Sequence, residues 1–266
     1  MLEIIGYVGS VLIGLTLGLM GGGGSILTVP LLVYLFAVTP VTATAYSLFI
    51  VGLTSLVGSA AYMNKKLVSF FTAFVFAVPA FTTIYLTRKF VVPSLPDEIF
   101  SIGNFTVSKD MFIMILFAVM MLAASVSMIK IKKENVEKKE QKFNYTMIIL
   151  EGIVVGFLTG LVGAGGGFLI IPALVVLANL PMKMAVGTSL LIIAVNSLIG
   201  FLGDVSVDVI INWQLLASIS ILAIIGIFIG SYLSKFVPGS KLKPAFGWFV
   251  LAMGIYIIAK EIIIKM

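Results

Sequence analysis

Two runs of glycine interrupt strongly apolar segments of this chain. Residues 18–30 read GLMGGGGSILTVP, and residues 160–172 read GLVGAGGGFLIIP. Glycine in a helix interior costs about 1 kcal/mol per residue relative to alanine. Backbone without helical hydrogen bonds survives at membrane depth only where protein buries it or where it lines a cavity. If the apolar segments lie in a membrane, the two runs therefore predict broken or re-entrant helices.

The composition places these segments in a lipid bilayer. Of 266 residues, 61% are hydrophobic and 11% are charged, whereas a soluble domain is roughly 45–50% apolar and about 25% charged. Cysteine and histidine are both absent, which removes thiolate nucleophiles and the common zinc and haem ligands. We expect no catalytic residue, no metal and no cofactor. The net charge of +6 is small and dispersed, so we also expect no nucleic acid partner.

Ten apolar segments form two sets of five. A helical crossing needs about 20 residues, and the second segment of each set is short for that. The first set covers about 4–20, 25–38, 41–63, 68–88 and 111–129, and the second covers about 146–162, 167–180, 184–203, 211–234 and 244–262. We therefore expect a first transmembrane repeat at 1–129, a charged cytoplasmic linker at 130–145 and a second repeat at 146–266. Whether the two short segments cross the membrane or re-enter it stays open.

The two halves are related in sequence. A shift of 142 residues aligns 14–60 with 156–202 without a gap, and 18 of the 47 positions are identical. The matches include glycines of both runs, Pro30 with Pro172, and Ser47 with Ser189. Because five segments are an odd number, the second half enters the membrane from the opposite side. The fold class that we predict is an all-α polytopic membrane protein with two inverted five-segment repeats, an architecture of many secondary transporters.

The distribution of charge sets the expected orientation. Placing the lysine-rich linker in the cytoplasm satisfies the positive-inside rule and puts both termini outside. Lys65 and Lys66 then also lie inside, whereas Arg88 and the acidic pair Asp204 and Asp208 fall in outer loops. We expect Arg88 to anchor the membrane interface or to attract anions to a vestibule.

The glycine runs are the predicted binding site. Each run should expose the N-terminus of a half-helix, whose first N–H groups lack partners and carry the positive end of the helix dipole. An anion can approach such a backbone closely. The expected backbone ligands are Gly21, Gly22, Gly23, Gly24 and Ser25 in the first run and Gly163, Gly165, Gly166 and Gly167 in the second. By contrast, spaced pairs such as Gly14 with Gly18 and Gly226 with Gly230 are typical of close helix packing and need no ligand.

Polar side chains at related positions of the two halves complete the predicted site. They are Thr44 and Ser47 in the first half and Thr188, Ser189 and Asn196 in the second. Their hydroxyl groups either donate to an anion or bond to their own backbone or a neighbouring helix. Asn196 is the strongest candidate, because an amide in the middle of a span needs a partner.

The pattern G-L-x-G-x-G-G-x-x-x-x-x-P occurs twice, at Gly18–Pro30 and at Gly160–Pro172. It resembles the signature of the TauE/SafE sulfite exporter family, as does the run AVGTSL at Ala185–Leu190. The resemblance covers nearly the whole chain and implies a permease for anions such as sulfite, sulfoacetate or related sulfonates. The first copy departs from the pattern at Ser25, where the second copy has Gly167.

We therefore expect a secondary active transporter of small anions in the cell (inner) membrane, working by alternating access. A passive anion channel and a carrier of a small carboxylate stay open as alternative functions. A homodimer stays open as the oligomeric state. An intramembrane enzyme is disfavoured, because the spans carry neither a nucleophile–base set nor a carboxylate near their centres.

Overall fold

A computed structural model describes residues 2–102, 105–129, 145–176, 178, 180–206, 211–234, 236 and 239–263. Nearly all of the predicted linker, together with Lys235 and Asp208, lies outside these residues. The helices of the first half are α1 (Leu2–Met20), α2 (Thr28–Leu35), α3 (Pro40–Asn64), α4 (Phe70–Leu86), α5 (Val92–Ser94) and α6 (Lys109–Ile129). Those of the second half are α7 (Tyr145–Val162), α8 (Gly167–Val176), α9 (Met182–Val205), α10 (Trp213–Leu233) and α11 (Gly239–Ile263).

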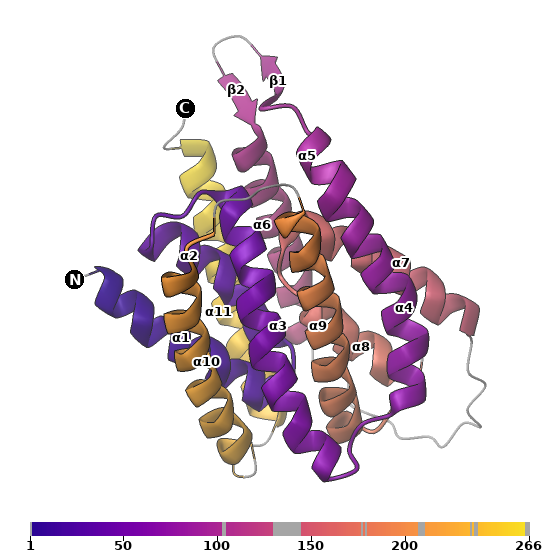
Figure 1. The fold of residues 1–266 in the computed structure, drawn as a ribbon. Helices are drawn as coiled ribbons and strands as arrows, with labels where there is room; N and C mark the ends of the chain where they lie inside the picture. Colours follow the sequence, from indigo (N-terminus) through magenta and orange to yellow (C-terminus); the bar gives the residue numbers. More distant parts are fainter. Residues whose placement is uncertain are drawn as a thin grey trace.

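The expected all-α polytopic fold is confirmed. Five helical stretches of the described chain are long and apolar enough to cross a membrane. They are Pro40–Asn64, Phe70–Ser94, Lys109–Val126, Met182–Val205 and Trp213–Leu233. The connection between α5 and α6 contains one feature that hydropathy did not indicate, a β-hairpin formed by the antiparallel strands β1 (Glu98–Ile102) and β2 (Phe105–Ser108). The hairpin projects from one end of the helix bundle (Figure 1).

The two short segments are half-helices. The helix α2 has 8 residues and α8 has 10. At a rise of 1.5 Å per residue they are about 12 and 15 Å long, roughly half of a hydrocarbon core of about 30 Å. Neither helix is long enough to cross a bilayer alone.

The central helices α3 and α9 lie side by side and run in opposite directions (Figure 1). Around them the two halves are interlaced. The first helix of the first half, α1, packs on α10 of the second half, and its counterpart α7 packs on α4 of the first half. The last helices of the halves, α6 and α11, pack on each other. Each half therefore buries its apolar surface mainly against the other half.

Spaced glycines allow the outer pairs to approach closely, as the sequence predicts. A Cβ added at Gly18 would lie 2.5 Å from the carbonyl oxygen of Ile227 in α10. A Cβ at Gly156 in α7 would lie 2.5 Å from the carbonyl oxygen of Ala80 in α4. A side chain at either position would separate the backbones, so these glycines serve helix packing.

Candidate functional site

The two glycine runs meet in space. A Cβ added at Gly22 would lie 2.5 Å from the carbonyl oxygen of Gly167, and a Cβ at Gly167 would lie 2.6 Å from the Cα of Gly22. Both residues are buried. The breaks of the two halves are therefore in backbone contact, which only residues without a side chain permit.

The first break is a left-handed glycine followed by a short 3-10 helix. Gly21 has φ +75° and donates to the carbonyl of Leu17 at 2.7 Å. The 3-10 helix spans Gly23–Leu27, and α2 begins only at Thr28. Helical backbone therefore does follow the glycines, but its first turns are 3-10, and the α-helical part begins three residues later than the expected residue 25. The hydroxyl of the buried Ser25 donates to the carbonyl of Gly22 at 2.9 Å, so it closes this turn.

The second break has a different backbone. Gly163, Gly165 and Gly166 have φ angles of +71°, +68° and +70°, in the left-handed region that favours glycine. The half-helix α8 begins directly at Gly167. Its start immediately after the glycines agrees with the prediction. The N–H groups of Leu169 and Ile170 already donate to the carbonyl of Gly166, at 2.9 and 3.1 Å, so the N–H groups available at this helix start are those before Leu169.

The central helices flank the two breaks at matched positions. A Cβ at Gly21 would lie 2.6 Å from Cγ1 of Val186 in α9. A Cβ at Gly163 would lie 2.6 Å from the Cα of Thr44 in α3. The 142-residue shift relates Gly21 to Gly163 and Thr44 to Val186. Each break therefore packs against the central helix of the other half.

Two of the predicted polar residues in α9 contact backbone. The hydroxyl of Thr188 accepts the backbone N–H of Ser69 at 2.9 Å, immediately before α4. At the matched position in α3, the hydroxyl of Tyr46 accepts the N–H of Asn212 at 2.6 Å, immediately before α10. Thr188 therefore satisfies a helix N-terminus. Ser189 instead reaches the first break, since its hydroxyl lies 2.8 Å from the carbonyl oxygen of Val186 and 3.3 Å from that of Gly21.

Other predicted residues present polar atoms without partners. Oδ1 of Asn196 and Oγ of Ser47 are buried and make no hydrogen bond within the described chain. The same holds for hydroxyl groups at matched positions near the middle of α3 and α9, those of Thr54, Ser55 and Ser197. A Cβ at Gly165 would lie 3.0 Å from Oγ of Ser197. Buried polar groups are rarely unpartnered in folded proteins, so these side chains are candidates for contact with a ligand, and Ser197 is the one that lies beside the second break.

Sequence reasoning misplaced one basic and one acidic residue. Arg88 was expected at the membrane interface and Asp204 in an outer loop, but their exposed fractions are 1% and 5%. Nη1 of Arg88 donates to Oγ1 of Thr44 at 2.9 Å and lies 3.4 Å from Oδ1 of Asp204. The two charged side chains are therefore inside the bundle, next to a predicted site residue.

The local sequence explains the position of Arg88. The helical backbone continues from α4 through a π-helical turn, Thr87–Val91, into α5. Pro93 lacks the N–H that an α-helix would direct at the carbonyl of Lys89, and this favours a wider turn. One signal in the sequence could have indicated that the helix continues past Arg88. Three apolar residues, Phe90, Val91 and Val92, follow before the first proline, Pro93.

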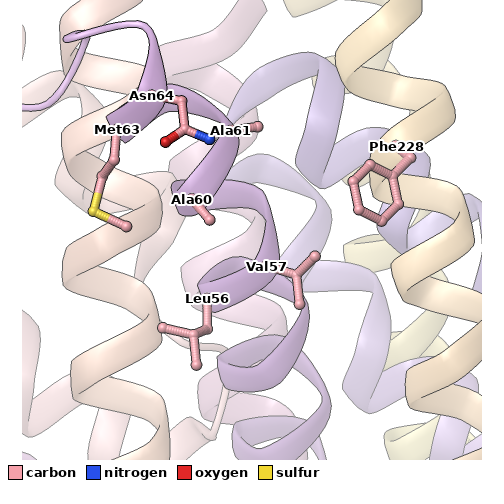
Figure 2. Close-up of a pocket in the computed structure, with 7 residues that line it drawn as sticks. All are labelled: Leu56, Val57, Ala60, Ala61, Met63, Asn64 and Phe228. Atoms are coloured by element: carbon pink, nitrogen blue, oxygen red, sulfur yellow. The ribbon is translucent and has the colours of Figure 1, made fainter.

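A groove of about 490 Å³ lies elsewhere, between α3 and α10. Figure 2 shows Val57 of α3 and Phe228 of α10 on its two sides. Its other lining residues are Leu56, Ala60, Ala61, Met63 and Asn64. Leu56 and Phe228 are exposed, as expected for a surface that contacts lipid. No predicted site residue lines this apolar groove.

The comparison with known proteins finds relatives that are named as probable membrane transporters. The chain is 30% identical over 253 residues to a "Probable membrane transporter protein" of Xylella fastidiosa (strain Temecula1), which covers 93% of this chain and 91% of the relative. It is 30% identical over 210 residues to the "Probable membrane transporter protein YunE" of Bacillus subtilis (strain 168), covering 71% and 75%. No solved structure gives a significant match.

The family model of the sulfite exporter TauE/SafE matches residues 7–257, from α1 into α11. The match includes both glycine breaks and the central helices that flank them. The chain is therefore a membrane transporter protein that belongs to the TauE/SafE sulfite exporter family.

Proposed function

We propose that this protein is a secondary active transporter of small anions, with sulfite, sulfoacetate and related sulfonates as substrates. The observation that carries the proposal is the contact between the two breaks at Gly22 and Gly167, enclosed by α3 and α9. The unpartnered hydroxyl groups of Thr159 and Ser197 lie beside the neighbouring Gly166 and Gly165. Backbone N–H groups at the start of α8 and hydroxyl donors nearby are suited to anion oxygens.

The same contact favours a carrier over a passive channel. An open channel needs a continuous wet path, whereas the two glycine backbones are too close to leave room for a methyl group. Opening a path requires the halves to move relative to each other. The antiparallel central pair and the interlaced outer helices support an inverted arrangement, in which alternating access moves one half against the other.

The distribution of charged residues supports the predicted orientation. The α3–α4 connection carries Lys65 and Lys66 and lies at the end of the bundle opposite the β-hairpin, whereas α11 ends at the same end of the bundle as the hairpin (Figure 1). We propose that the lysine-bearing end faces the cytoplasm and that the hairpin faces outward from the inner membrane.

Uptake into proteoliposomes tests the function. Labelled sulfite, sulfoacetate and acetate are supplied in turn, with and without an imposed pH gradient. We expect saturable uptake and counterflow of a sulfur oxyanion. Uptake of acetate alone would preserve the anion site and reject the sulfur substrate. Unsaturable flux without counterflow would establish the channel, and no uptake by folded protein would reject the proposal.

A further inference from the structure

Arg88 and Asp204 form an incomplete ion pair. Only Nη1 of the guanidinium approaches the carboxylate, at 3.4 Å, and it also donates to Thr44. Nε and Nη2 of Arg88 and Oδ2 of Asp204 are buried and have no partner within the described residues. A purely structural Arg–carboxylate pair in a low-dielectric interior is expected to use two parallel bonds, because each unpartnered buried group is costly.

The unpartnered nitrogens share one edge of the guanidinium. The N–H of Nε and one N–H of Nη2 point in the same direction, and this edge matches two oxygens on one central atom. Thr44 and Asp204 hold the opposite corner through Nη1. The contacts at Nη1 thus orient the side chain and leave the edge with two parallel donors available.

The position of Arg88 connects this edge to the second break. Thr44, which Arg88 contacts, is also the residue against which the left-handed Gly163 packs. The unpartnered hydroxyl of Ser47 lies one turn farther along α3. On the other side, a Cβ at Gly203 in α9 would lie 2.9 Å from the Cβ of Arg88, so α9 confines the side chain.

We propose that the Nε–Nη2 edge of Arg88 binds the oxyanion substrate through two parallel hydrogen bonds, with Thr44 and Asp204 as positioning residues. This inference rests on the proposed function and assigns the residue that recognises the substrate. It specifies the substrate class as anions with two or more oxygens on one atom, such as sulfite, sulfonates and carboxylates. Chloride offers one acceptor centre instead of two oxygens matched to the two parallel donors, so we expect it to bind more weakly.

Four variants test the inference. Arg88→Lys keeps the charge and removes the bidentate edge. Arg88→Gln combined with Asp204→Asn removes both charges, so no lone charge stays buried. Asp204→Asn removes the negative charge but keeps an Oδ1 acceptor for Nη1, so it tests the positioning role of Asp204. Lys89→Gln is the matched control, because it removes the neighbouring cation, whose Nζ lies over the rings of Tyr85 and Phe90 instead of inside the bundle.

The first measurement is the KM and kcat of sulfoacetate or sulfite uptake in proteoliposomes, whichever anion the wild type transports. We expect Arg88→Lys to raise KM about 10- to 100-fold, the range for loss of a hydrogen bond to a charged group. Asp204→Asn should raise KM by less than Arg88→Lys does, because it weakens the contact that orients Arg88, and Lys89→Gln should leave KM at the wild-type value. The second measurement is the unfolding temperature in detergent, which sulfoacetate but not chloride should raise in the wild type, with no such rise in the Arg88→Gln/Asp204→Asn variant.

Two results would overturn the inference while leaving the proposed function intact. One is a wild-type KM in Arg88→Lys or in the folded double variant. The other is equal protection of the wild type by chloride and sulfoacetate. If the wild type itself transports none of the anions, the proposed function fails and this inference fails with it. Arg88→Lys retains the ion pair, so a folding defect confined to the double variant does not remove the test.

Discussion

The two breaks share a sequence pattern but reach their contact through different backbones. The first uses one left-handed glycine, Gly21, and then a 3-10 helix that starts at Gly23. The second uses three left-handed glycines and enters α8 without a 3-10 helix. Matched glycines in a repeat therefore do not have matched conformations, and the same residue type is required for different reasons in the two halves.

The surroundings of the breaks differ as well. The second break adjoins Thr44, which contacts the buried Arg88, whereas the first adjoins Val186 at the matched position. A hydrogen bond links the first break to α9 through Ser189, while the matched Ser47 has no partner in the described chain. The second break is thus the more polar and less satisfied one, and we expect it to dominate substrate recognition.

The largest effect is expected where the two breaks touch. Gly22→Val or Gly167→Val would force the two backbones apart, because no room exists for a methyl group. Uptake of the transported anion in proteoliposomes should be abolished in both variants. Ala60→Val, at an exposed position of α3 away from the breaks, is the comparison variant. Normal transport by either glycine variant would show that the contact is dispensable.

The second-largest effect is expected to distinguish the backbone conformation of the second break from that of the first. Gly166→Ala places a side chain at φ +70° and close to the hydroxyl of Thr159, and we expect a loss of about 1–3 kcal/mol of stability. Gly23→Ala, in the 3-10 helix of the first break, should cost less, because Gly23 is not left-handed. Chemical denaturation in detergent measures both. Equal losses would contradict the conformational difference between the breaks.

A third pair of variants tests whether the two halves have corresponding hydrogen bonds at matched positions outside the glycine breaks. Thr188→Val removes the acceptor for Ser69 N–H before α4, and Tyr46→Phe removes the acceptor for Asn212 N–H before α10. Each should lower the free energy of unfolding by about 1–2 kcal/mol, because a backbone donor at a helix start loses its partner. A loss confined to one of the two variants would restrict the correspondence to the glycine runs.

The smallest effect concerns the departure of the first run from the repeated pattern. Ser25→Ala removes the hydrogen bond to the carbonyl of Gly22 and should cost about 1 kcal/mol. The unfolding temperature of this variant compared with the wild type provides the measurement. No change would mean that the serine does not stabilise the 3-10 helix, and the different backbone of the first break would need another cause.

Much of the fold was predictable, because the lengths of the apolar segments and the doubled glycine pattern are local properties of the chain. The half-helices α2 and α8 follow from apolar segments too short to span, and the close packing of α1 on α10 follows from glycines spaced by four. The β-hairpin was not predictable from hydropathy, since its residues read as an ordinary outer loop. The roles of Ser25 and Thr188 were not predictable either, because the same hydroxyl can bond an anion, a turn or a helix start.

The amino-acid sequence by itself determined that this chain is a helical membrane protein with two related halves, each broken at a glycine run. These features need only segment length, hydropathy and the conformational freedom of glycine. Only the tertiary structure decided that Gly22 meets Gly167 and that Arg88 and Asp204 lie inside the bundle. Such contacts join residues from different helices, and their energy depends on the packing and the local dielectric of the folded protein, which neither half specifies alone.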